Sequence, residues 1–200
     1  MKLRTFVIIA SPFVGYYYVD QKLSAKYPDI PLSQLPSDSK LKQFMKPKTS
    51  KQYFAYSDIY KTTVKSESLD QLNLKFLSTP GISNLVSNES KTAPLQSQVL
   101  KTFDSKNSKS TILEWHWSSN SGIVPFFETL SSYGYPWRMM NGGLHEILIK
   151  KSQSNPDEFD VWFSTTHEYN DKRDGKLIPN WVQSLHRNYA RVLLYLATEK

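Results

Sequence analysis

The fold of this chain depends on the stretch FDVWFSTTHEY, which occupies residues 159–169. The stretch is rich in β-branched and aromatic residues, and polar residues recur at alternate positions. This pattern is typical of a β-strand, because neighbouring side chains of a strand point to opposite faces of the sheet. We therefore expect a central strand here, and the other elements are placed relative to it.

The residues before this strand predict its hairpin partner. A second strand pattern covers residues 144–150, and residues 152–158 contain the turn. An antiparallel register that opposes odd-numbered residues keeps the odd positions of both strands on one face. Apolar residues dominate that set, so we expect it to form the inner face of the sheet. Its members are His145, Ile147, Ile149, Val161, Phe163 and His167.

The remaining patterns complete an α+β chain. A C-terminal helix from Pro179 to near Thr198 has apolar residues at helical spacing. The other expected elements are a strand at 53–64, a helix from Ser68 to Leu77, a second short helix within 82–90 and a hairpin of strands at 95–103 and 110–118. Residues 123–130 are apolar and fit either a helix or a strand. This order predicts a curved antiparallel sheet wrapped around the long C-terminal helix.

Three stretches of the last third share their pattern with a known superfamily. They are GGLHEI at 142–147, FDVWFS at 159–164, and PNW at 179–181, which leads into LHRNYAR at 185–191. Together they resemble the START-like helix-grip superfamily, which includes polyketide cyclase-like and lipid-transfer-like proteins. The resemblance implies a hydrophobic ligand cavity between sheet and helix, and the binding or transfer of lipids or other apolar molecules. It also implies cyclase or hydrolase activity in some members.

Length and composition limit the possible classes of protein. A chain of 200 residues with an apolar fraction of 39% suffices for one core. The formal net charge of +7 favours anionic partners such as phospholipid headgroups. Its basic residues are scattered and belong to no nucleic-acid-binding motif, so we expect no nucleic-acid partner. The lack of cysteine excludes disulfides, thiolate catalysis and cysteine-ligated metals.

Residues 1–19 predict a hydrophobic anchor or targeting segment. Two basic residues precede an apolar run from Thr5 to Val19, which ends on three tyrosines and is interrupted by a proline and a glycine. As a helix the run would extend ~22 Å, less than the ~30 Å of a bilayer core. A cleaved signal peptide, which would end on small residues, and a strand buried in a soluble core are the alternatives.

The first nineteen residues also suggest a destination. Acidic residues are missing from them, which fits a mitochondrial membrane but does not distinguish it from the endoplasmic reticulum. Residues 20–52 contain four prolines among polar residues and predict a linker. We expect residues 53–200 to form a single α+β domain that folds without the N-terminal segment.

Aromatic and methionine side chains mark the candidate ligand contacts. The stretch YGYPWRMM at 133–140 combines them with a glycine and a proline, as in a loop that gates an apolar cavity. Ordinary packing in the core is the alternative for this loop. The expected ligand-binding residues are Trp137, Met139, Met140, Ile147, Val161, Phe163, Trp181 and Tyr189.

His145 and His167 are the candidate catalytic residues, because both belong to the expected inner face. Such a pair can act as general base and acid, or can bind Zn²⁺ together with a carboxylate. Strand histidines more often form hydrogen bonds within a core, and the chain contains no H-E-x-x-H motif, phosphate-binding glycine loop or serine-hydrolase elbow. The sequence therefore predicts no metal and no cofactor, and it does not assign an enzyme.

The leading hypothesis is a membrane-associated protein that binds a lipid or isoprenoid-like molecule between sheet and helix. One alternative is an enzyme that acts on an apolar substrate through the two histidines. The other is an assembly or interaction subunit without a ligand.

Overall fold

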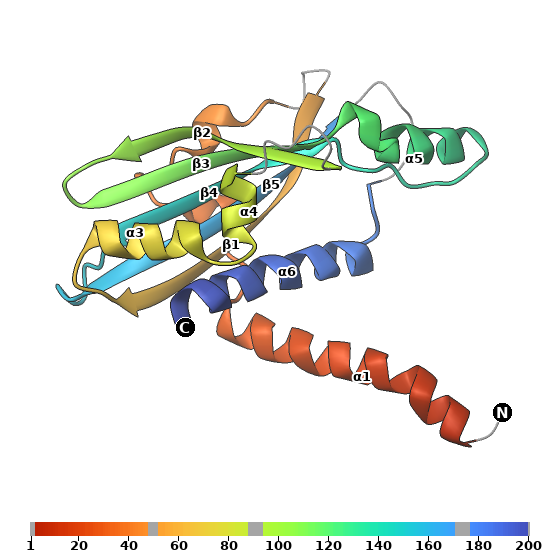
Figure 1. The fold of residues 1–200 in the computed structure, drawn as a ribbon, viewed down its shortest axis with the longest axis horizontal. Coiled ribbons are helices and arrows are strands. Elements are labelled where there is room, and N and C mark those ends of the chain that lie inside the picture. Colours follow the sequence, from red (N-terminus) through yellow and green to blue (C-terminus); the bar gives the residue numbers. More distant parts are fainter. Residues whose placement is uncertain (1–2, 48–51, 88–93, 171–176, 200) are drawn as a thin grey trace.

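A computed structural model describes residues 3–47, 52–87, 94–170 and 177–199 of the chain. It has α+β architecture, with one five-stranded antiparallel sheet in the order β1-β5-β4-β3-β2 and a long C-terminal helix (Figure 1). The strands are β1 (Gln52–Lys65), β2 (Leu95–Asp104), β3 (Ser108–Trp117), β4 (Gly142–Lys151) and β5 (Glu158–Asn170). The α-helices are α1 (Leu3–Lys26), α2 (Leu41–Phe44), α3 (Leu69–Ser78), α4 (Ile82–Ser87), α5 (Ile123–Ser132) and α6 (Asn180–Glu199). Two 3₁₀ turns cover Leu32–Gln34 and Ser119–Ser121.

The elements expected from the sequence within 53–170 are confirmed. Ser68 caps α3 by accepting a hydrogen bond from the backbone N–H of Gln71, as its position before the helix predicts. The apolar stretch that fitted either a helix or a strand is the helix α5. Of the second short helix expected within 82–90, α4 covers residues 82–87, and the rest lies outside the described residues.

The first and last strands of the chain are neighbours in the sheet. β1 pairs with β5 from Gln52 opposite Asn170 to Lys65 opposite Glu158, with one bulge between Phe54 and Tyr56. β5 pairs with β4 along its other edge, where Ile147 lies opposite Phe163. This register confirms that odd-numbered residues of the β4–β5 hairpin share a face.

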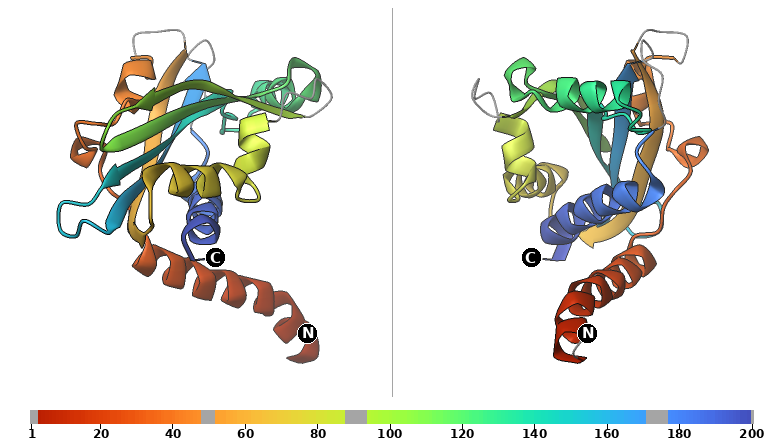
Figure 2. Two further views of the ribbon diagram at one scale, coloured as in Figure 1. Left: turned by 60° about the vertical axis from the view of Figure 1, so that its left-hand side comes forward. Right: turned by 90° about the vertical axis from the view of Figure 1, so that its right-hand side faces the viewer.

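That shared face is the inner face, and three helices cover it. Figure 2 shows α3, α4 and α6 on one side of the sheet and the segment before β1 on the other. The core beneath the helices contains Leu72 and Phe76 from α3, Ile82 and Leu85 from α4, Leu193 and Leu194 from α6, and Ile147, Ile149, Val161 and Phe163 from the sheet. Removal of these apolar side chains from water is the main favourable contribution to the fold.

Residues 30–46 cover the outer face of the sheet. Leu35 and Leu41 pack with four buried side chains of the outer face, Phe54, Ile59, Ile112 and Leu144. The buried carboxylate of Glu146 on β4 accepts hydrogen bonds from Ser39 Oγ (2.5 Å), the Lys40 backbone N–H (2.7 Å) and Ser110 Oγ (2.6 Å). Much of the segment expected to be a linker is therefore packed, because its apolar residues fill a sheet face that would otherwise meet water.

Helix α1 packs along α6 in the same direction. Tyr16 Oη lies 2.7 Å from Ser184 Oγ, and the Asn188 side-chain amide donates to Asp20 (2.8 Å). The buried guanidinium of Arg191 donates to the Tyr27 carbonyl oxygen (3.0 Å) and to Asp29 (3.1 Å), which joins α6 to the chain that follows α1.

Leu3–Lys26 form a helix, so the alternative of a strand in this segment is wrong. The proline and glycine of the apolar run lie within α1. Among the described residues, no helix combines the length and the apolar character that crossing a bilayer requires.

Gly143 gives a test of how closely the strands pack. A Cβ atom on this residue would meet the carbonyl oxygen of Thr166 and the indole ring of Trp115. We expect Gly143→Ala to lower the free energy of unfolding by ~1–3 kcal/mol, because neither group can move without disturbing the sheet. Urea-induced unfolding measures this change.

The matched control is Gly15→Ala in α1, where a Cβ atom meets nothing within 4 Å. Alanine favours a helix over glycine by ~1 kcal/mol, so this variant should be as stable as the parent or more stable. Equal stability of Gly143→Ala and the parent would contradict the packing described for β4 and β5.

Candidate functional site

The sheet residues expected to bind a ligand form part of the core. Ile147, Val161 and Phe163 are at most 1% exposed and pack in one cluster with Leu193 and Leu194 of α6. Their side chains fill the space between sheet and helix at this end of the inner face. Any ligand contact must therefore be found elsewhere on the molecule.

The methionine and aromatic residues of 137–140 lie near the other end of the inner face. Met140 is buried in a cluster with Trp115, Tyr169 and Ile178. Trp137 and Met139 are half-buried, and the Trp137 ring contacts Tyr135 edge to face, with 5.3 Å between the ring centroids. Only Met140 of these three is placed among the buried aromatic side chains of the sheet.

Trp181 and Tyr189 lie on a face of α6 that the sheet does not cover. Trp181 is 66% exposed, and Leu185 and Tyr189 are each 48% exposed. Together with Val192 they follow the i, i+4, i+8, i+11 spacing of one helix face. We refer to these four residues as the α6 apolar stripe. Exposed apolar residues gathered in this way are typical of a surface that binds a partner or a lipid.

His145 is buried between two aromatic rings. Its ring lies 6.2 Å from the ring of Trp115 and 5.7 Å from that of Phe163, in stacked arrangements. Burial, with a smaller contribution from His186, lowers the pKa of His145 to about 3, so the ring is neutral near pH 7. An imidazole with this pKa is a weak base near pH 7, which argues against His145 as a general base.

His167 lies in a different group of titratable side chains. Its Nε2 is 3.2 Å from Nδ1 of His186 on α6, and His186 Nδ1 is 3.9 Å from Asp58 Oδ2 on β1. We refer to Asp58, His167 and His186 as the Asp-His-His cluster. The expected pair of His145 and His167 is therefore divided, since only His167 belongs to this cluster.

Neighbouring residues hold the cluster in place. The Tyr56 ring stacks on His167 with 4.1 Å between centroids. Arg187 donates from Nε to Asp58 Oδ1 (3.1 Å) and from Nη2 to Gln183 (3.1 Å), so it fixes one carboxylate oxygen. The other oxygen, Oδ2, is buried and has no hydrogen-bond partner among the described residues.

Burial sets the protonation of the cluster. It raises the pKa of Asp58 to about 6, although the hydrogen bond and charge of Arg187 act in the opposite direction. Burial and the charge of Arg187 lower the pKa of His186 to about 4, and burial lowers the pKa of His167 well below its usual value. Both rings are therefore neutral at pH 7 and present unprotonated nitrogen atoms.

The part of the inner face around the cluster has incompletely paired polar atoms. Buried atoms there that have no hydrogen-bond partner among the described residues include Asp58 Oδ2, Trp115 Nε1, His145 Nδ1, Thr165 Oγ1 and His167 Nδ1. An unpaired buried polar group costs ~1–3 kcal/mol, so such groups usually mark a place where water, an ion or a ligand binds. Their concentration makes this part of the sheet the candidate functional site.

The sequence analysis did not single out Asp58 or His186. Asp58 alternates with Tyr56 and Tyr60 on β1, and the His186 side chain of α6 contacts His167 of β5. Alternation and helical spacing could have placed each of them on an inner face. Their contact with His167 depends on which strands pair, and this information is not contained in either pattern.

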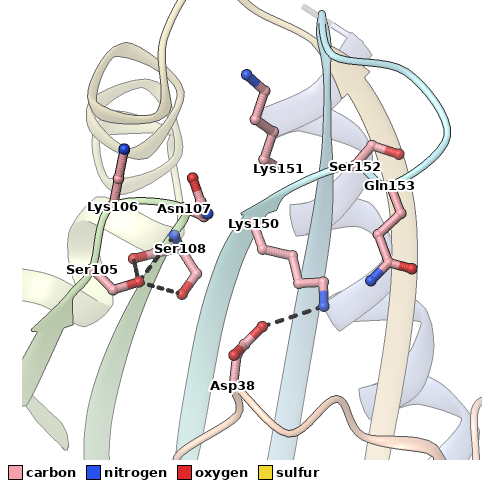
Figure 3. Close-up of a pocket in the computed structure, with 9 residues that line it drawn as sticks. All are labelled: Asp38, Ser105, Lys106, Asn107, Ser108, Lys150, Lys151, Ser152 and Gln153. Atoms are coloured by element: carbon pink, nitrogen blue, oxygen red, sulfur yellow. Dashed lines mark hydrogen bonds and ion pairs between the residues drawn. The ribbon is translucent and has the colours of Figure 1, made fainter.

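A polar hollow lies at the opposite end of the sheet, at the tips of the two hairpins (Figure 3). Lys150 forms an ion pair with Asp38 at 3.3 Å, and Ser105 and Ser108 are joined by hydrogen bonds. Lys106 and Lys151 contribute two further positive charges. These are surface side chains on turns, so we describe the hollow as a basic and solvated end of the molecule.

Comparison with protein-family models and with curated proteins finds no match to this chain. The site is therefore interpreted from its own geometry.

His145 should make stability depend on pH. Its pKa is about 3 in the folded protein and about 6.5 in an unfolded chain, so the unfolded state binds the extra proton between these values. The contribution of His145 to stability is thus present above pH 6.5 and is lost as the pH falls toward 3. Substitution of His145 by a residue that does not titrate should reduce the slope of the unfolding free energy against pH by up to ~1.4 kcal/mol per pH unit.

Unfolding of His145→Phe by urea between pH 4 and pH 7.5, compared with the parent, measures this slope. His116→Phe is the matched control, because His116 is exposed. A His145→Phe protein with the same slope as the parent would show that His145 is accessible to protons in the folded state.

Proposed function

We propose that this chain is a membrane-associated protein of helix-grip architecture that binds an apolar molecule such as a lipid or an isoprenoid. The observation that carries the proposal is the α6 apolar stripe. It exposes large side chains that a water-soluble helix normally buries. The pattern that resembles the helix-grip superfamily in the last third of the chain supports the same proposal.

Two other helices expose apolar side chains. On α1 these are Val14, Tyr17 and Tyr18, and on α5 and the loop after it they are Phe126 and Tyr133. No residue of α5 is buried, although the helix is mostly apolar. An apolar helix without a fully buried residue is typical of one that contacts another apolar phase.

Part of the exposed apolar surface lies at one end of the molecule. The beginning of α6, which contains Trp181, and helix α5 lie at the same end in Figure 1. The hairpin tips with Lys106, Lys150 and Lys151 lie at the other end. This distribution supports an orientation in which the apolar end meets the bilayer and the charged end faces water.

Tyrosine and tryptophan give this end the composition of a membrane interface. Their rings combine an apolar body with a polar tip and are favoured at the level of the headgroups. The net charge of +7 adds attraction to anionic phospholipids. We infer that a mitochondrial or endoplasmic reticulum membrane is the site of action.

The α6 apolar stripe is also where we place the bound molecule. Trp181 and Tyr189 were expected ligand contacts, and both are free to receive one. The corresponding sheet residues, Ile147, Val161 and Phe163, pack against other side chains of the core. An apolar molecule that partitions into the bilayer would reach the stripe without leaving the membrane surface.

Membrane binding is tested with the double variant Trp181→Ser/Leu185→Ser. Burial of each large apolar side chain contributes ~1.5–3 kcal/mol, so the variant should bind vesicles at least ~10-fold more weakly. Co-sedimentation of the full chain with phosphatidylcholine vesicles, with and without an anionic phospholipid, measures this.

Leu100→Ser is the matched control, because Leu100 is 40% exposed and lies on β2, at the opposite edge of the sheet from β1, whereas α6 packs near β1 and β5. It should bind vesicles as the parent does. Equal binding of vesicles by the double variant and the parent would show that α6 does not contact the membrane.

Ligand binding is tested separately from membrane binding. We expect solvent extraction of the purified full chain, followed by mass spectrometry, to release one class of lipid or isoprenoid. The Trp181→Ser/Leu185→Ser protein should release much less of it. A folded parent protein that releases none and also fails to bind a fluorescent fatty acid would contradict the ligand proposal.

A further inference from the structure

The Asp-His-His cluster combines three side chains that come from three separate elements. Asp58 is on β1, His167 on β5 and His186 on α6. One ligand atom from each can be chosen so that all three lie within 4.8 Å of one another. Carboxylate oxygen and imidazole nitrogen are the common ligands of zinc and related transition metals.

The separations within the cluster suit a common ion. In a tetrahedral site with metal–nitrogen distances of ~2.0–2.1 Å, ligand atoms are ~3.3 Å apart. His167 Nε2 lies 3.2 Å from Nδ1 and 3.3 Å from Nε2 of His186. Either nitrogen of His186 can therefore be the ligand after a rotation of its ring. Asp58 Oδ2 is 3.9 Å from His186 Nδ1, and the three ligand atoms lie within 4.8 Å of one another, so the carboxylate has to move closer to the two rings to share an ion with them.

The unpaired oxygen of Asp58 is the second and independent observation. Asp58 is 5% exposed, and its Oδ2 has no hydrogen-bond partner among the described residues. A hydrogen bond between the two imidazoles would pair one nitrogen from each ring and would leave this oxygen unpaired. An ion bound by all three side chains would pair it as well.

Arg187 fits the role of an outer partner of this site. Its positive charge alone would weaken cation binding, but its Nε–H is directed to the other oxygen of Asp58. Ligating carboxylates are commonly oriented in this way by a hydrogen bond to the oxygen that does not touch the metal. The Tyr56 ring is stacked on His167 and restricts the orientation of that imidazole, as Arg187 does for the Asp58 carboxylate.

We propose that Asp58, His167 and His186 bind one divalent transition-metal ion, for which Zn²⁺ is the appropriate probe. The two histidines are neutral at pH 7, as metal ligands must be. The side chain of His186 is 22% exposed, so the ion reaches the site from the α6 side. Three protein ligands leave the fourth position to water or a substrate atom, which is the arrangement of catalytic rather than structural zinc sites.

This site does not depend on the membrane proposal, because none of its ligands belongs to the α6 apolar stripe. A metal at this position would also change the classification of the chain, since the sequence predicts neither a metal nor a cofactor. His145 would lie outside the metal's ligands and keep its role in packing.

The test uses the untagged full chain, treated with a chelator and dialysed, and then titrated with Zn²⁺ by calorimetry. We expect one ion per chain. His186→Ala should lower the affinity at least ~100-fold, because removal of even an outer partner of a metal site typically lowers it 10–100-fold. His116→Ala should bind as the parent does, since His116 is exposed and hydrogen-bonds to Gln96.

Co²⁺ gives a second readout that does not depend on affinity alone. The parent loaded with Co²⁺ should show the intense visible absorption of a four-coordinate ion, and Asp58→Asn should change that spectrum. If His186→Ala does not fold without metal, His186→Gln replaces it in both measurements. A parent that binds no Zn²⁺, or variants of His186 that bind it as tightly as the parent, would overturn the proposal.

Discussion

The pairing of β1 with β5 is the constraint on which the rest of the structure depends. It joins the first and last strands of the chain in one antiparallel ladder, and β5 is thereby enclosed between β1 and β4. The ladder places Asp58 opposite Thr165 and next to His167. Helix α6 follows β5 in the chain and packs across the inner face of the sheet. Both the core and the Asp-His-His cluster follow from this single contact.

The inner face combines two kinds of surface along one strand. Phe159, Val161 and Phe163 of β5 pack against the helices, whereas Thr165 and His167, on the same face, are buried among polar and aromatic groups. The apolar part stabilises the fold, and its contribution offsets the cost of polar atoms that are buried without partners in the other part. Proteins commonly accept such a local cost where they bind a ligand or an ion.

Local patterns in the sequence were sufficient for the strands, for helices α3, α4 and α6 and for the faces of the β4–β5 hairpin. Ile147 opposite Phe163 follows from alternation and a short turn, which are local properties. The packing of Leu41 on Leu144 of the outer face and of Tyr27 beside Arg191 could not be predicted in this way, because these partners are more than a hundred residues away. The same reason explains why His167 was recognised but its contacts Asp58 and His186 were not. The four prolines between residues 28 and 47 also suggested a linker, whereas the apolar residues between them pack on the outer face of the sheet.

The segment that covers the outer face has a consequence for the order in which the chain is synthesised. Residues 39 and 40 are held by Glu146, which follows them by about a hundred positions. At translation rates of ~5–20 residues per second, the segment waits roughly 5–20 s for its partner to leave the ribosome. During that interval Leu35, Leu41, Phe54 and Ile59 have no outer sheet face to pack against. The nascent chain therefore exposes these apolar side chains to water until β4 and β5 complete the sheet.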